Sequence, residues 1–121
     1  MTEIVLYHNP RCSKSRAALA LLEARGSGFR VVEYLREPLT RRELSELRAR
    51  LSRDPVSWIR SKESAFAEAG LSESSSEEEL LAAVEAHPIL LERPIAVRGD
   101  RAVIGRPPER ILELLDPSEA P

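Results

Sequence analysis

The sequence holds a single cysteine among its 121 residues, which excludes a disulfide within the chain. A lone thiol suits a reducing compartment, so we expect a cytoplasmic protein. No apolar run approaches the roughly 20 residues that a membrane span needs, and no signal peptide is visible at the N-terminus. The formal net charge is −2, without the strong basic excess typical of nucleic-acid binders. We therefore expect neither a membrane nor a nucleic acid among the partners.

Cofactor motifs are equally scarce. The cysteine and histidines are not spaced as metal ligands, and the sequence has no glycine-rich phosphate-binding loop. We therefore predict a site without a metal or a bound cofactor. Hydrophobic residues make up 42% of the chain and charged residues 31%, which is ordinary for a globular protein. We expect one domain over residues 1–121.

The first part of the chain predicts a β-α-β unit. Residues 3–7 and 29–34 are rich in β-branched and aromatic residues, as strands are. Residues from about 12 to 25 are helix formers, and Gly26 follows them. Such a unit implies two parallel strands joined by a right-handed crossover.

A helical insert over residues from about 39 to 90 is predicted next. Thr40 with Glu43, and Ser76 with Glu79, each form a capping box, which marks the start of a helix. Shorter helices are expected between these two, at residues 54–60, where Asp-Pro resembles a helix start, and at residues 64–69.

The last third of the chain predicts β-structure again. Residues 94–97 and 101–104 flank a turn and form an antiparallel hairpin, and residues from 107 onward lead into a final helix. The order β-α-β, helices, β-β-α describes an α/β protein with a four-stranded mixed sheet flanked by helices. This is the thioredoxin-like fold, with a helical insertion between its βαβ and ββα halves.

Cys12 lies where the first predicted strand turns into the first helix. Backbone N–H groups at a helix N-terminus lack partners within the helix and favour negative charge, so a thiol there has a lowered pKa. The same features attract an oxyanion. Arg11, Lys14 and Arg16 add positive charge nearby. A free cysteine is often a small buried hydrophobe, but the polar and charged neighbours favour a reactive thiol.

Residues 7–16, YHNPRCSKSR, resemble the active-site segment of the glutaredoxin-dependent arsenate reductases, the ArsC family. Residues 87–95, HPILLERPI, and residues 105–107, GRP, resemble two further signatures of that family. The similarity runs over essentially the whole chain and is to the shorter branch of the family. The resemblance implies the reduction of arsenate to arsenite, with glutathione as co-substrate and glutaredoxin as partner.

The resemblance also implies roles for individual residues. Cys12 falls on the nucleophilic cysteine, and Pro94 on the proline that is cis and faces the cysteine in thioredoxin-like folds. His8 and Ser15 match positions near the thiolate, where Ser15 would hydrogen-bond the sulfur. The oxyanion would be held by three arginines, Arg60, Arg93 and Arg106.

The chemistry of arginine agrees with these roles, because guanidinium groups stay charged and donate paired hydrogen bonds to tetrahedral oxyanions. Any one arginine could instead be a solvated surface charge. Arg93 is the strongest exception, since it lies between an apolar run and a predicted strand. His8 keeps two interpretations, as a structural hydrogen-bonding group or as a group that tunes Cys12.

With one cysteine in the chain, a thiol from another molecule must resolve any adduct on Cys12. Two alternatives stay open beside arsenate reduction. One is a reductase-like thiol oxidoreductase acting on another substrate. The other is an Spx-like regulator that binds RNA polymerase; many of those carry a two-cysteine switch, and Ser15 at the second position makes that switch unavailable here.

Overall fold

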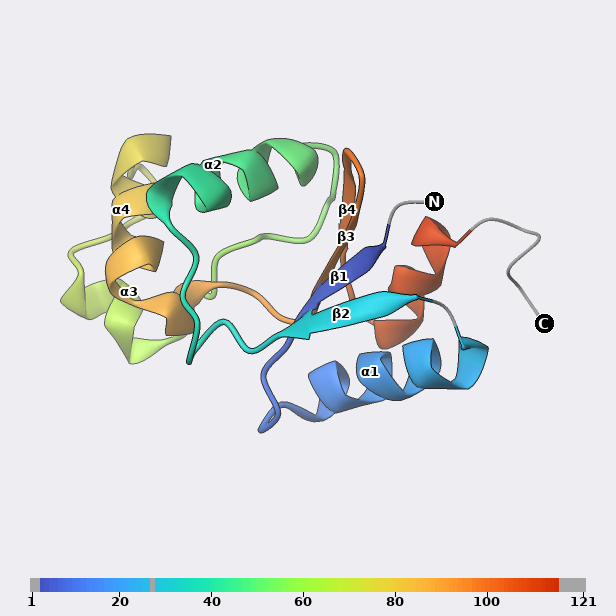
Figure 1. Cartoon of the computed structure of the whole chain (residues 1–121). Coiled ribbons are helices and arrows are strands. Elements are labelled where there is room, and N and C mark those ends of the chain that lie inside the picture. Colours follow the sequence, from blue (N-terminus) through green and yellow to red (C-terminus); the bar gives the residue numbers. More distant parts are fainter. Residues whose placement is uncertain (1–2, 27, 116–121) are drawn as a thin grey trace.

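The computed structural model describes residues 3–26 and 28–115. A four-stranded sheet with the order β2-β1-β3-β4 lies at its centre (Figure 1). The strands are β1 (Ile4–Tyr7), β2 (Phe29–Val32), β3 (Ile95–Arg98) and β4 (Arg101–Ile104). β1 and β2 run parallel, while β3 is antiparallel to both β1 and β4. The mixed sheet flanked by helices that the sequence predicts is confirmed.

Helices lie on both sides of this sheet (Figure 1). α1 (Ser13–Arg25) and the 3₁₀ helix η2 (Pro108–Leu114) pack together on one face. The elements between β2 and β3 gather on the opposite side: α2 (Arg41–Arg50), α3 (Ser64–Glu68), α4 (Glu77–Ala86) and the 3₁₀ helix η1 (Pro88–Leu90). The helical insertion therefore covers one face of the sheet. The other face is covered by α1 from the βαβ half and by η2 from the ββα half.

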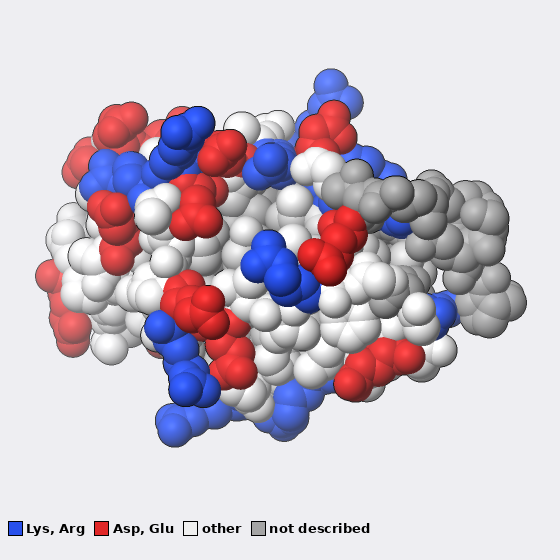
Figure 2. Space-filling model, viewed as in Figure 1, with Lys and Arg blue, Asp and Glu red and all other residues white. Residues whose placement is uncertain are grey.

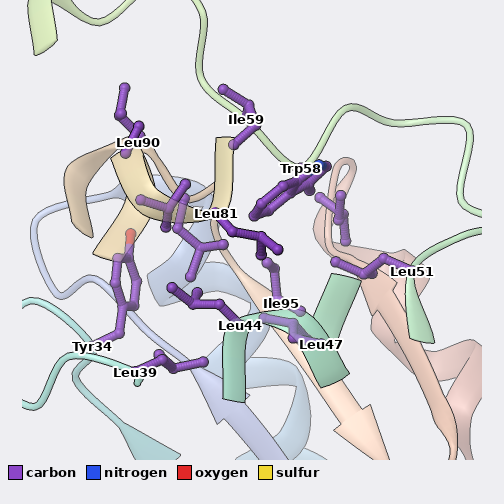
Figure 3. Close-up of a cluster of buried hydrophobic side chains, with 14 of the residues drawn as sticks. Tyr34, Leu39, Leu44, Leu47, Leu51, Trp58, Ile59, Leu81, Leu90 and Ile95 are labelled. Atoms are coloured by element: carbon purple, nitrogen blue, oxygen red, sulfur yellow. The ribbon is translucent and has the colours of Figure 1, made fainter. Parts of the chain in front are cut away.

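Alternation along the strands divides the core into two clusters. Ile95 and Val97 of β3 pack with α2 and α4, whereas Ala96 between them packs with α1 and η2. In the larger cluster Trp58 and Leu81 lie side by side over the leucines of α2 (Figure 3). Both faces of the sheet are apolar, so both need a layer of helices to exclude water.

Both predicted capping boxes are present. Thr40 Oγ1 accepts a hydrogen bond from the Glu43 N–H at 3.1 Å, and the Glu43 carboxylate accepts one from the Thr40 N–H at 2.9 Å. Ser76 and Glu79 exchange the same two bonds, at 3.1 and 3.0 Å, where α4 begins. These bonds satisfy N–H groups that have no partner within the helix, and so they set where α2 and α4 begin.

The helix predicted over residues 54–60 is wrong. The Asp54 side chain is 2% exposed, and its Oδ2 accepts a hydrogen bond from the backbone N–H of Ile104 in β4 at 2.9 Å. The chain then continues without a helix, and Ile59 forms an isolated antiparallel bridge with Leu91. The long-range bond to β4 uses the carboxylate that the sequence pattern assigned to a helix start.

None of the helices in residues 3–26 and 28–115 is long and apolar enough to cross a membrane. On the face shown in Figure 2, basic and acidic side chains intermingle. This mixture agrees with the formal net charge of −2.

Candidate active site

Cys12 is the N-cap residue of α1, directly after the turn that follows β1, and its thiol is free and half-buried. Burial alone raises the pKa of the Cys12 thiol, but hydrogen bonds from the backbone N–H groups of Ser15 and Lys14, together with the Arg93 guanidinium, outweigh it. The net pKa is lowered from its ordinary value. The helix N-terminus and one arginine therefore favour the nucleophilic thiolate.

His8 and Ser15 form a buried pair beside the cysteine. His8 Nδ1 lies 2.7 Å from Ser15 Oγ, and the Asn9 N–H donates to the same oxygen at 3.0 Å. Burial lowers the pKa of His8, so the imidazole is neutral at neutral pH. The backbone N–H of Ser15 is among the groups that lower the pKa of the Cys12 thiol, while the Ser15 hydroxyl is engaged with His8 and Asn9. His8 thus holds the side chain of Ser15.

Arg93 lies just before β3 and Arg106 just after β4, so both reach Cys12 from the open end of the β3–β4 hairpin. Arg106 Nη2 lies 3.8 Å from Cys12 Sγ, and Arg106 Nε donates to the main-chain oxygen of Arg93 at 2.9 Å. Each of these two arginines precedes a cis peptide bond, to Pro94 and to Pro107. The cis form expected at Pro94 is therefore present, and Pro94 is buried.

Arg60 is linked to the other two arginines through carboxylates. Its Nη1 lies 2.7 Å from Glu92 Oε1, and its Nε lies 3.1 Å from Glu63 Oε1. The backbone N–H of Arg60 donates to Leu90 at 2.8 Å, which fixes the end of the non-helical segment against η1. Arg60, Glu92 and Arg106 line one cavity of about 340 Å³.

Glu92 was not predicted from the sequence. Its Oε1 accepts from Arg60 Nη1 at 2.7 Å, from Arg106 Nε at 3.0 Å and from the main-chain N–H of Arg93 at 3.0 Å. Glu63 Oε1 lies 3.8 Å from Arg93 Nη1. Both carboxylates stand close to an arginine in the sequence, but such neighbours are common in a chain with 31% charged residues. Only the fold shows that one oxygen joins all three arginines.

Some buried donors at this site have no hydrogen-bond partner in the part of the chain that the structure describes. Arg93 is 13% exposed, yet its Nε and Nη1 atoms make no hydrogen bond there. The Tyr34 hydroxyl is buried and unpartnered in the same way, and burial raises the pKa of Tyr34 to about 12, so it keeps its proton. Unpaired buried donors cost free energy, and an anion beside Cys12 would accept hydrogen bonds from Arg93. Metal binding finds no such support, because the described residues contain no cluster of three or more His, Cys, Asp or Glu able to hold a metal ion.

Comparison with known proteins finds one family and several relatives that this chain resembles. The model of the ArsC family matches residues 7–114. An arsenate reductase of Neisseria meningitidis serogroup A is 44% identical over 117 residues, which cover 95% of this chain and 100% of the relative. The uncharacterized protein YfgD of Escherichia coli K12 is 44% identical over 115 residues, which cover 93% of this chain and 97% of YfgD.

Among solved structures, an arsenate reductase from Vibrio cholerae superposes with a TM-score of 0.87 at 43% sequence identity. The superposition covers 94% of this chain and 98% of the other. The family match over residues 7–114, this level of identity and the same fold lead to one conclusion: the chain belongs to the ArsC family.

Proposed function

We propose that the protein is an arsenate reductase in which the Cys12 thiolate attacks arsenate. The observation that carries this proposal is the convergence of Arg93 and Arg106 on the Cys12 thiol, with Arg106 Nη2 3.8 Å from the sulfur. Arsenate is a tetrahedral oxyanion, the kind of ligand that guanidinium groups bind through paired hydrogen bonds. The names of the relatives from Neisseria meningitidis and Vibrio cholerae support the same substrate.

Each arginine has its own part in the proposal. Arg93 holds the oxyanion against the sulfur, because its guanidinium acts on the Cys12 thiol and its Nε and Nη1 atoms make no hydrogen bond within the described chain. Arg106 contacts both the sulfur and the neighbouring cavity, so it binds the oxyanion and stabilises the thiolate. Arg60 lines that cavity and supports the arsenic-bound intermediate from a greater distance.

The electrons come from two thiols. Cys12 displaces one arsenate oxygen, which leaves as water, and an S–As bond forms. A second thiolate then attacks the Cys12 sulfur. An S–S bond forms, the S–As bond breaks, and its electron pair stays on arsenic, which leaves as arsenite. Because the chain has one cysteine, the second thiol belongs to another molecule. We assign that role to glutathione, and glutaredoxin then reduces the mixed disulfide in the reducing environment of the cytoplasm.

The direct test measures arsenite formed from arsenate, with glutathione and glutaredoxin each omitted in turn. Arsenite should form only with both present. Arg93→Ala should raise the KM for arsenate about tenfold or more, as expected for a lost charge-assisted hydrogen bond. Arg42→Ala is the control, because the Arg42 side chain is 90% exposed on α2 and pairs there with Glu46, away from Cys12. An unchanged KM in Arg93→Ala would remove Arg93 from the substrate site.

One observation favours a second candidate function. YfgD, whose name assigns no reaction, is as similar to this chain as the Neisseria meningitidis arsenate reductase. A thiol oxidoreductase acting on another substrate would use the same activated Cys12. In that case arsenate would give no arsenite, while Cys12 would still exchange rapidly with small disulfides.

A further inference from the structure

Tyr34 lies just after β2, and its side chain is fully buried in the larger core cluster. In Figure 3 its hydroxyl points toward Leu90, in the segment of chain that leads on to Arg93. This hydroxyl makes no hydrogen bond within the described residues. Buried tyrosine hydroxyls normally find a hydrogen-bond partner, so this one calls for an explanation.

The charged groups that act most strongly on the Tyr34 hydroxyl belong to the active site. Arg93 has the largest influence on its ionisation, followed by Arg60, Cys12 and Glu92. Tyr34 thus approaches the site from the side of the core, with Arg93 as the charged group that affects it most.

Arg93 is held less firmly than the other two arginines of the site. Arg60 Nη1 and Arg106 Nε lie 2.7 and 3.0 Å from the shared carboxylate oxygen of Glu92. The Arg93 guanidinium pairs with Glu63 at the longer distance of 3.8 Å, and its Nε and Nη1 make no hydrogen bond in the described chain. The arginine that acts on the thiol therefore has two free donors beside an unpartnered hydroxyl.

A hydrogen-bonded link between Tyr34 and Arg93 would satisfy unpartnered groups on both residues. The hydroxyl oxygen can accept from Nε or Nη1 of the guanidinium. The link is direct after a rotation of the guanidinium, or it crosses one water molecule, which couples two polar groups nearly as well.

The tyrosine is also a neutral partner. Burial raises the pKa of Tyr34 to about 12, so its hydroxyl keeps the proton at neutral pH. A carboxylate in the same place would offset the positive charge with which Arg93 lowers the pKa of the Cys12 thiol. A neutral acceptor holds the guanidinium and leaves that charge available.

We propose that Tyr34 is a positioning residue, whose hydroxyl holds the Arg93 guanidinium beside Cys12 and beside the oxyanion bound there. The statement about the oxyanion rests on the proposed function, whereas the statement about the thiol does not. Tyr34 acts through Arg93 and not by contact with the substrate.

The pH midpoint of Cys12 alkylation by iodoacetamide tests this link without arsenate. Tyr34→Phe removes one oxygen atom and keeps the ring in the core, so the variant should fold. Its midpoint should move to higher pH by about 0.3 to 1 unit, the effect of one lost hydrogen bond. In turnover, the same variant should raise the KM for arsenate more than it lowers kcat.

A double-mutant cycle shows whether the effect passes through Arg93. Once Arg93→Ala has removed the guanidinium, adding Tyr34→Phe should move the midpoint no further, because the two residues act as one unit. A hydroxyl that only supports the core would give the same shift in both backgrounds.

Tyr7→Phe is the matched control, since it removes the same hydroxyl from the other tyrosine of the chain. Tyr7 packs against the same core cluster, but the charged groups that act most strongly on it are Glu43 and Arg30, outside the active site. Its alkylation midpoint should equal that of the wild type.

Three results would overturn the role of Tyr34: an unchanged midpoint in Tyr34→Phe, the same shift in Tyr7→Phe, or a shift that persists in the Arg93→Ala background. Failure of the wild type to form arsenite would overturn the proposed function alone, since the alkylation assay contains no arsenate.

Discussion

Arg60 Nη1 lies 2.7 Å from Glu92 Oε1, although 32 positions separate the two residues in the sequence. The same oxygen accepts from Arg106 Nε and from the main-chain N–H of Arg93. One half-buried carboxylate thus sets the position of three arginines. Its charge matters as well as its shape, because hydrogen bonds between ions are about twice as strong as neutral ones.

Glu92→Gln should lower kcat/KM for arsenate about 10- to 100-fold, because the anchor shared by the arginines would lose its negative charge, and small displacements at a reacting centre are costly. The fold should survive, since the amide oxygen of glutamine still accepts hydrogen bonds. Glu113→Gln is the control, because the Glu113 carboxylate pairs with Arg110 on the exposed η2 surface, away from the three arginines. Wild-type kinetics in Glu92→Gln would show that the arginines do not depend on this carboxylate.

The pH dependence of alkylation tests the state of Cys12. Only the thiolate reacts, and the pKa of Cys12 is lowered, so the rate of reaction with iodoacetamide should rise with pH and reach half its maximum below the free-cysteine pKa of about 8.5. Arg93→Ala should move this midpoint to higher pH, because the guanidinium stabilises the thiolate. Lys14→Ala should leave it unchanged, since Lys14 acts through its backbone N–H. A wild-type midpoint at or above about 8.5 would contradict the activated thiol.

Gly105 leaves room for Pro94, which follows Arg93 through a cis peptide bond. A Cβ at position 105 would lie 2.8 Å from Pro94 Cγ and 3.1 Å from Ile111 Cγ2. Gly105→Ala should therefore destabilise the fold by about 1–3 kcal/mol through overpacking. Gly28→Ala is the control, because a Cβ at position 28 would meet no described atom within 4 Å, and the backbone there has no positive φ. Urea unfolding of the two variants separates a steric effect from a general effect of adding a methyl group, and equal stabilities would contradict the close packing of Gly105.

Asp54 ties the helical insert to the sheet, through its bond to the Ile104 N–H and an ion pair with Arg110 at 2.9 Å. Burial alone raises the pKa of the Asp54 carboxyl, but hydrogen bonds from Ile104 and Val56 and from Arg110 lower it overall. The folded-state pKa is thus below the unfolded value, so the stabilisation is complete above the unfolded pKa of about 3.9 and is lost as the pH falls through the folded pKa.

Asp54→Ala should cost about 1–3 kcal/mol or more at pH 7, since it leaves a buried N–H without an acceptor. The difference between wild type and Asp54→Asn in the free energy of unfolding should shrink once the pH falls below about 3.9. Asp100→Asn, in the exposed turn of the hairpin, should show neither effect. A pH-independent difference would mean that the charge of Asp54 contributes nothing.

Local patterns predicted much of the fold. The capping boxes at Thr40 and Ser76 join residues three positions apart, so the sequence alone contains both partners. Cys12 was predictable for the same reason, because a strand followed directly by a helix places it at the helix N-terminus whatever surrounds it. These features depend on a few neighbouring residues.

Such local patterns do not predict contacts between residues that are far apart in the sequence. Asp54 resembles a helix start in the sequence. In the structure its carboxylate accepts a hydrogen bond from the N–H of Ile104 in β4, 50 positions away, and no helix begins there. The role of Glu92 has the same origin, since its partners Arg60 and Arg106 come from separate parts of the chain. The resemblance to the ArsC family indicated the three arginines but not the carboxylate that joins them.

The most direct measurement is arsenate-dependent oxidation of NADPH in the presence of glutathione, glutaredoxin and glutathione reductase, with wild type and Cys12→Ser assayed side by side. Serine is a favoured N-cap residue, so the variant should fold as well as the wild type by circular dichroism and thermal unfolding. The account predicts arsenate-dependent turnover by the wild type and none by folded Cys12→Ser. Equal turnover by both proteins, or none by a wild type whose Cys12 is readily alkylated, would contradict it.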